Sequence, residues 1–102
     1  MFVRTGQTVY EQIISLDMDN NPLSAATFEA IIYRDGDIDN DVSVNMSLSD
    51  AQRAVFTASW SASTFGDYQL YAKNNDTDVI FISNTVFVRS DSEISPTIYV
   101  GL

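Results

Sequence analysis

The 102-residue sequence contains no cysteine and no histidine. Without cysteine there are no disulfides, thiolate nucleophiles or zinc–thiolate sites, and without histidine there is no side chain that ordinarily titrates near neutral pH. The N-terminus lacks the apolar core of a signal peptide, and no run of about 18 apolar residues could span a membrane. We therefore expect a non-enzymatic protein that needs no cofactor.

Basic residues are also scarce, because five Lys and Arg stand against fourteen Asp and Glu and give a net charge of −9. Such a field repels phosphate backbones and anionic lipid headgroups, so neither nucleic acid nor a membrane is an expected partner. The length fits a single domain, 1–102, and an apolar content of 45% can supply a modest core.

What the sequence does contain is alternation of apolar and polar residues with a period of two, which is typical of half-buried strands. Residues 8–16 are rich in β-formers and place Tyr10, Gln12, Ile14 and Leu16 on one face. The polar pair Ser83-Asn84 interrupts residues 79–90 and predicts two short strands or a bulge. The clearest alternating segments are 27–34, 41–48, 53–60 and 67–73.

Turn signals separate these segments at residues 17–22, 34–37 and 74–78, which are rich in Asp, Asn and Gly. No segment has sustained helical periodicity. Short strands at this spacing predict an all-β fold, an antiparallel β-sandwich of about seven strands, with a small barrel as the alternative.

Both ends of the chain fall outside the predicted sandwich. Residues 1–5 and 93–102 are expected to be short arms that become ordered on a neighbouring molecule. Residues 96–102 are β-prone and begin with proline, which suits an edge strand or an arm. Deleting 93–102 is then expected to abolish association and leave the domain folded.

Two acidic turns are candidate calcium ligands because they present hard oxygen atoms at high density. The EF-hand pattern fails in both, since its glycine position holds Asn40 in one and Pro22 in the other. A looser site would require the two turns to meet at one end of the sandwich. A solvated acidic hairpin is the preferred interpretation, and no metal is assigned. The candidate ligands are Asp35, Asp37, Asp39 and Asp41 in the first turn and Asp17 and Asp19 in the second.

The aromatic residues divide into two predicted sets. Phe28, Phe56, Trp60 and Tyr68 share strand faces with aliphatic residues and are expected in the core. Exposed aromatic residues are enriched where proteins bind partners, so the second set is a candidate contact surface. The candidate partner-binding residues are Tyr33, Tyr71, Phe87, Tyr99, Ile98 and Val100.

Catalytic alternatives find little support in the strand pattern. Alternation points Glu11, Glu29 and Glu93 outward, as surface residues rather than as a glycosidase pair in a cleft. Lys73 is the one lysine and is expected in solvent, which disfavours a Ser–Lys nucleophile pair. A small hydrolase that uses carboxylates is therefore the least favoured function.

The order of turns and strands resembles the immunoglobulin-like β-sandwich modules of tailed-phage virion proteins. Gly6-Gln7-Thr8-Val9 leads into a first strand, and the hydrophilic turn Asp17-Met18-Asp19-Asn20-Asn21-Pro22-Leu23 precedes the second. Phe65-Gly66-Asp67-Tyr68 resembles the Gly-x-Tyr entry to a late strand of those modules. The resemblance covers roughly residues 5 to 90 and lies mainly in turn chemistry, which unrelated sandwiches can reinvent.

The resemblance implies a non-enzymatic structural protein of a bacteriophage particle, located in the virion. Its expected partners are other virion proteins and copies of itself, in a decoration, stabilising or adaptor role on the capsid or tail. Adhesin-type modules normally lie within long chains, whereas this one starts at its own Met and stops twelve residues after Ser90, so a free-standing subunit is expected. The alternative is a carbohydrate- or calcium-binding adhesin or fibre-tip module.

Overall fold

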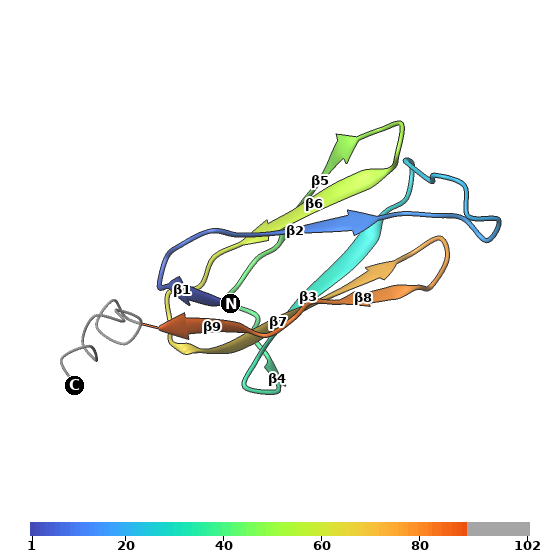
Figure 1. Cartoon of the computed structure of the whole chain (residues 1–102). Coiled ribbons are helices and arrows are strands. Elements are labelled where there is room, and N and C mark those ends of the chain that lie inside the picture. The colour runs from blue at the N-terminus through green and yellow to red at the C-terminus, as the bar shows by residue number, and fades with distance from the viewer. Residues whose placement is uncertain (90–102) are drawn as a thin grey trace, which may run out of the picture.

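The computed structural model describes residues 1–89, which form nine β-strands in two layers (Figure 1). The larger sheet has the order β1-β9-β7-β3-β4, with β8 also paired to β7, and the smaller sheet has the order β2-β6-β5. Because the sheets are separate, the fold is a sandwich rather than a barrel. The strands are β1 (Phe2–Arg4), β2 (Val9–Ile14), β3 (Phe28–Arg34), β4 (Asp37–Ile38), β5 (Asn45–Asp50), β6 (Val55–Trp60), β7 (Gly66–Asn74), β8 (Ile80–Ile82) and β9 (Val86–Arg89).

Strand pairing is antiparallel throughout, apart from β1, which runs parallel to β9. The longest ladder joins β3 to β7, from Phe28 opposite Asn74 to Arg34 opposite Tyr68. β8 and β9 follow one another along the same side of β7. No helix in residues 1–89 is long and apolar enough to cross a membrane.

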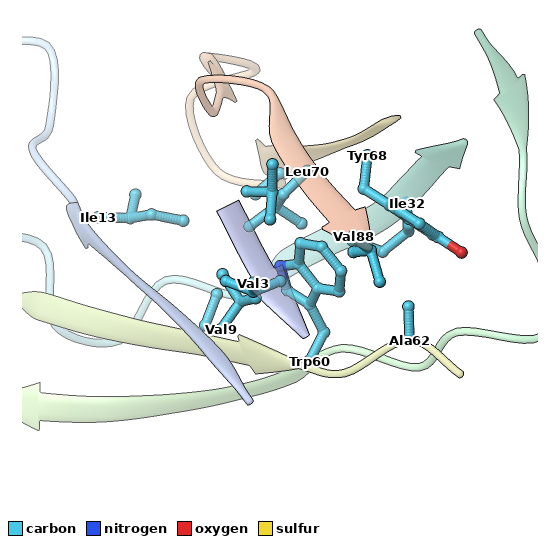
Figure 2. Packing of buried hydrophobic residues seen from close by; sticks show 12 residues of the cluster. Val3, Val9, Ile13, Ile32, Trp60, Ala62, Tyr68, Leu70 and Val88 are labelled. Atoms are coloured by element: carbon cyan, nitrogen blue, oxygen red, sulfur yellow. The ribbon is translucent and has the colours of Figure 1, made fainter. Parts of the chain in front are cut away.

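The core lies between the sheets and follows the predicted alternation. In β6 and β7 every second residue is buried, which brings Trp60 of the smaller sheet against Tyr68 of the larger one, with ring centroids 5.5 Å apart (Figure 2). Leu70 and Ile32 fill the space beside them. Each such side chain contributes roughly 1.5–3 kcal/mol when fully buried. The predicted core positions of Phe56, Trp60 and Tyr68 are confirmed, and Phe28 is half-buried against the core.

The sequence predicts the strand β2 but does not determine which of its two faces is buried. Tyr10 and Ile14 are 66% and 65% exposed, whereas Val9 and Ile13 are buried. Glu11 shares the inward side with Val9 and Ile13, so the predicted outward position is wrong. Both faces of β2 carry apolar residues, and the pairing with β6 decides which one is buried.

The N-terminal arm predicted for residues 1–5 is also wrong, because residues 2–4 form β1. Val3 is only 4% exposed and belongs to the core, and the amide of Thr5 donates to the carbonyl of Arg89 at 3.2 Å. Three residues are too few to show alternation, so only the pairing with β9 reveals this strand. The second predicted arm, 93–102, lies outside the described residues.

Two strand boundaries differ from the sequence prediction. The segment predicted at 41–48 begins its strand pairing only at Asn45, although Val42 and Val44 still pack against the core. The break predicted in 79–90 is present, because residues 83–85 separate β8 from β9. Ser83 is buried there, and its hydroxyl accepts a hydrogen bond from the amide of Leu70 at 2.9 Å.

Candidate partner-binding face

The outward side of the larger sheet, which we call the outer face, gathers apolar side chains from six strands. Cross-strand partners in a ladder point to the same side, so the register defines its members. Tyr71 lies between Ile31 on β3 and Ile82 on β8, which are its cross-strand partners on either side. Tyr33 lies opposite Ile38 of β4. The large apolar and aromatic members are Phe2, Ile31, Tyr33, Ile38, Tyr71, Ile80, Ile82 and Phe87.

Two aromatic pairs organise this face. The rings of Phe2 and Phe87 stack with their centroids 4.9 Å apart. The rings of Tyr33 and Tyr71 are tilted against each other, with their centroids 4.5 Å apart. Phe2 remains 64% exposed despite its stacking partner. Aromatic pairs held in this way lose little conformational entropy when a partner covers them, which is why such residues dominate binding energy at interfaces.

The charge of the outer face differs from that of the whole chain. Register places three basic side chains here, Arg4, Lys73 and Arg89, and two acidic ones, Glu29 and Asp67. Arg89 is tied to Asp67 at 2.6 Å, with its guanidinium 5.6 Å from the centre of the Phe87 ring. In a protein of net charge −9, this is a surface where an acidic or neutral partner meets little repulsion.

The outward side of the smaller sheet has a different composition. Its centre consists of hydroxyl and amide side chains, with Asn45 opposite Ser59 and Ser47 opposite Thr57. Apolar residues on this side are confined to the strand β2, at Tyr10 and Ile14, and to Val55 beside Ile14. The two sides of the sandwich are therefore unequal, and the outer face of the larger sheet is the more apolar.

Sequence reasoning selected Tyr33, Tyr71 and Phe87, and the structure brings all three to the outer face. It missed Phe2, because the N-terminus was assigned to an arm, and it missed Ile38 and Ile82, which lie on very short strands. Only the ladder register shows that these residues share a surface. The remaining candidates, Ile98, Tyr99 and Val100, lie outside the described residues.

The candidate calcium ligands do not converge. Asp35 lies at one end of β7, where its amide donates to the carbonyl of Asp67 and its carboxylate accepts from the amide of Asp67. The turn with Asp17 lies near the other end of β7, because the side-chain amide of Asn74 donates to the hydroxyl of Ser15 at 3.0 Å. Seven residue steps along β7, roughly 23 Å, separate Asp67 from Asn74.

Several of these carboxylates are already used as turn caps. Asp17 accepts hydrogen bonds from the amides of Asp19 and Asn21, and Asp39 accepts one from the amide of Asp41. Asp37, which also lines the shallow pocket at this end, is exposed. Within residues 1–89, no group of three or more acidic side chains is arranged to hold a metal ion.

The connection between β6 and β7 carries a feature that is diagnostic of one fold. The buried Tyr68, near the start of β7, donates its hydroxyl hydrogen to the carbonyl of Thr64 at 2.8 Å. A tyrosine bonded to backbone a few residues upstream at this corner is a hallmark of immunoglobulin-type sandwiches. The order β2-β6-β5 facing β9-β7-β3 also matches strands B, E and D facing G, F and C.

Comparison with solved structures agrees with this topology. The crystal structure of the Lin-41 filamin domain matches with a TM-score of 0.63 and 19% identity, over 86% of this chain and 82% of that one. The fold is an immunoglobulin-like β-sandwich. The predicted fold class is thereby confirmed. No family model and no curated protein matches the sequence.

Within this immunoglobulin-like sandwich, the outer face is the G-F-C side and the polar side is B-E-D. An identity of 19% supports the likeness in fold and nothing about shared partners. The chemistry of the outer face therefore carries any functional conclusion.

Proposed function

We propose that this immunoglobulin-like domain is a non-enzymatic structural subunit that attaches to other proteins of a bacteriophage particle through the outer face of its larger sheet. The observation that carries the attachment is the cluster of half-exposed aromatic and aliphatic side chains on that face, centred on Tyr33, Tyr71 and Phe87. The phage particle follows from the resemblance of the turn sequences at 17–23 and 65–68 to virion modules.

The physical basis of attachment would be burial of an apolar surface whose side chains are already ordered. The contacts between Tyr33 and Tyr71 and between Phe2 and Phe87 hold four rings in place before any partner arrives. Covering such preorganised rings costs less entropy than ordering free side chains. Arg89 and Lys73 at the margin of the patch would then favour a partner with acidic groups.

The first test is whether the protein is a stoichiometric component of a virion. Phage particles produced by the strain from which this sequence derives are purified on a density gradient, and their proteins are quantified by mass spectrometry. We expect the protein in a fixed ratio to the major capsid or tail protein. Its absence from infectious particles would overturn the proposal.

The second test concerns the face. Recombinant variants are added back to particles stripped of the protein, and the bound fraction is measured. Tyr71→Asp places a charge at the centre of the outer face and is expected to weaken binding more than tenfold, the size typical of an interface hot spot. Ser47→Asp adds the same charge to the polar side and should bind like the parent. Equal binding by both variants would exclude the outer face.

The adhesin alternative has its own signature. A calcium-dependent rise in melting temperature, or binding of the isolated domain to a glycan array, would favour a fibre-tip module. With the acidic turns at opposite ends of β7 and several of their carboxylates engaged as caps, we expect no shift at millimolar calcium. A shift of several degrees would replace the structural role with the alternative.

A further inference from the structure

The sandwich has an open side between β2 of the smaller sheet and β8 of the larger one (Figure 1). Within residues 1–89, β2 is paired on one side only, to β6, and β8 is paired only to β7. Immunoglobulin-type sandwiches of the constant kind place a further strand, A, beside strand B. Here that position beside β2 is unfilled by the described part of the chain, since β1 pairs with β9 instead.

A groove of about 510 Å³ occupies this open side. Apolar side chains of both sheets line it, among them Ile13, Leu16, Phe28, Ile80 and Phe81. Asp17 is the one charged residue in its lining, and the polar lining residues Asn74 and Thr77 lie at the end of β7. Exposed backbone on an edge strand beside an apolar groove is the site at which an extended segment adds to a sheet.

The chain itself contains a segment of matching pattern. In residues 97–102, Ile98, Val100 and Leu102 alternate with Thr97, Tyr99 and Gly101, so an extended conformation would present three aliphatic side chains on one side. The six residues equal the length of β2, and none of them has a charged side chain. They follow Pro96, which has no backbone N–H to donate to a sheet and therefore suits the position at which an added strand begins.

Geometry decides whose groove this segment can fill. Antiparallel pairing, as in β2–β6 and β6–β5, requires the segment to enter beside Ile14. Arg89 follows Val88, which lies opposite Gly66 at the start of β7. Ile14 precedes Ser15, whose hydroxyl accepts a hydrogen bond from the Asn74 side chain at the end of β7. The path along β7 from Gly66 to Asn74 is roughly 26 Å, and the gap of roughly 10 Å between the sheets lies at right angles to it, so the straight-line distance is about 28 Å. The eight residue steps from Arg89 to Thr97 span about 26–29 Å only when fully extended. The segment could therefore enter its own groove in this direction only with a taut connection, whereas the groove of a second copy imposes no such limit.

We propose that residues 97–102 of one copy of this chain add as an antiparallel strand beside β2 of a second copy and fill its groove. Reciprocal exchange fills both grooves and closes a symmetric dimer. The inference concerns a different side of the molecule from the outer face and stands whether or not that face binds a virion protein. Because each copy carries a net charge of −9, added salt should strengthen the association by screening repulsion.

The absence of native cysteine allows a direct test by disulfide trapping. Gln12→Cys, at the exposed middle of β2, and Tyr99→Cys, at the middle of the segment, are placed in separate full-length chains and mixed under mild oxidation. We expect a covalent heterodimer. Ser47→Cys, on β5 at the opposite edge of the same sheet, replaces Gln12→Cys in the control and should trap at least tenfold less.

The other outcomes overturn the proposal in distinct ways. Equal trapping by the Ser47→Cys control would show random collision. Absence of trapping in the mixture, with a disulfide within a monomer when both cysteines are in one chain, would show that the segment fills the groove of its own chain. Absence of any disulfide would show that the groove has another occupant or none.

A second measurement needs no crosslink. Native mass spectrometry and sedimentation should show a dimer of the parent chain, and Val100→Asp should raise its dissociation constant more than tenfold because the aspartate would enter the apolar groove. Thr97→Asp adds the same charge to the opposite side of the segment and should leave the dimer in place. A monomeric parent chain, or equal weakening by both variants, would contradict the inference. Unchanged circular dichroism spectra will confirm that the variants are folded.

Discussion

Tyr68 donates a hydrogen bond from its buried hydroxyl to the carbonyl of Thr64, four residues earlier, at 2.8 Å. This bond fixes the corner where the chain leaves the smaller sheet after β6 and enters the larger sheet as β7. The ring of Tyr68 also packs on Trp60, so one side chain joins the corner, the central strand of the larger sheet and the core.

Tyr68→Phe should therefore lower the free energy of unfolding by about 1–2 kcal/mol, because it removes a buried hydrogen bond and keeps the ring. Urea denaturation followed by tryptophan fluorescence measures the change. Tyr71→Phe makes the same chemical change on the outer face and should stay within about 0.5 kcal/mol of the parent. Equal effects would mean that the corner bond does not stabilise the fold.

Val3→Ala tests whether the N-terminus is part of the sandwich. Val3 is buried between the sheets, so losing two methyl groups and leaving a small cavity should cost about 1–3 kcal/mol. Thermal unfolding measures the loss, with Thr8→Ala, an exposed residue outside the strands, as the control. If Val3→Ala unfolds like the control, residues 1–5 are an arm, as the sequence pattern suggested.

The buried pair Ser15 and Asn74 connects the two sheets at the groove end. The side-chain amide group of Asn74 donates through its nitrogen to the hydroxyl of Ser15, and its oxygen accepts from the backbone amides of Asp76 and Thr77. Ser15→Ala leaves a buried donor without its partner and should cost about 1–3 kcal/mol. Exposed Ser47→Ala should cost less than about 0.5 kcal/mol. Chemical denaturation of both variants checks the difference, and equal costs would contradict a stabilising role for the pair.

The partial burial of Glu11 makes the free energy of unfolding depend on pH. Burial raises the pKa of its carboxyl in the folded protein above the ordinary value of 4.5. The folded state then binds the proton more tightly than the unfolded state, so this residue lowers stability as the pH rises from 4.5 through the folded-state pKa. Below pH 4.5 both states are protonated and the penalty disappears.

Glu11→Gln removes this titration and should raise the melting temperature at pH 7, with the difference from the parent shrinking toward pH 4. Glu29→Gln, at an exposed position of β3, is the matched control and should show no such trend. Melting curves between pH 4 and pH 8 measure it. A Glu11→Gln variant that is less stable at pH 7 would show that the carboxylate has a stabilising contact.

The period-two pattern was enough to predict most of the strands, the break near Ser83 and the core positions of Trp60 and Tyr68. These features depend on neighbours along the chain, since alternation assigns each side chain to one of two faces. Local pattern failed where both faces were apolar, as in β2, and where strands were very short, as in β1 and β4.

The sequence by itself determined that this protein is built of short β-strands, carries a marked negative charge and has neither cysteine nor histidine. Only the tertiary structure decided that the strands form two separate sheets, that Val3 is in the core, that Phe2 and Phe87 stack, and that, among residues 1–89, one edge of β2 is unpaired beside an apolar groove. Those features arise from pairing between segments far apart in the chain, as when Phe2 meets Phe87, and ladder register is a property of two strands together that neither strand's own pattern contains.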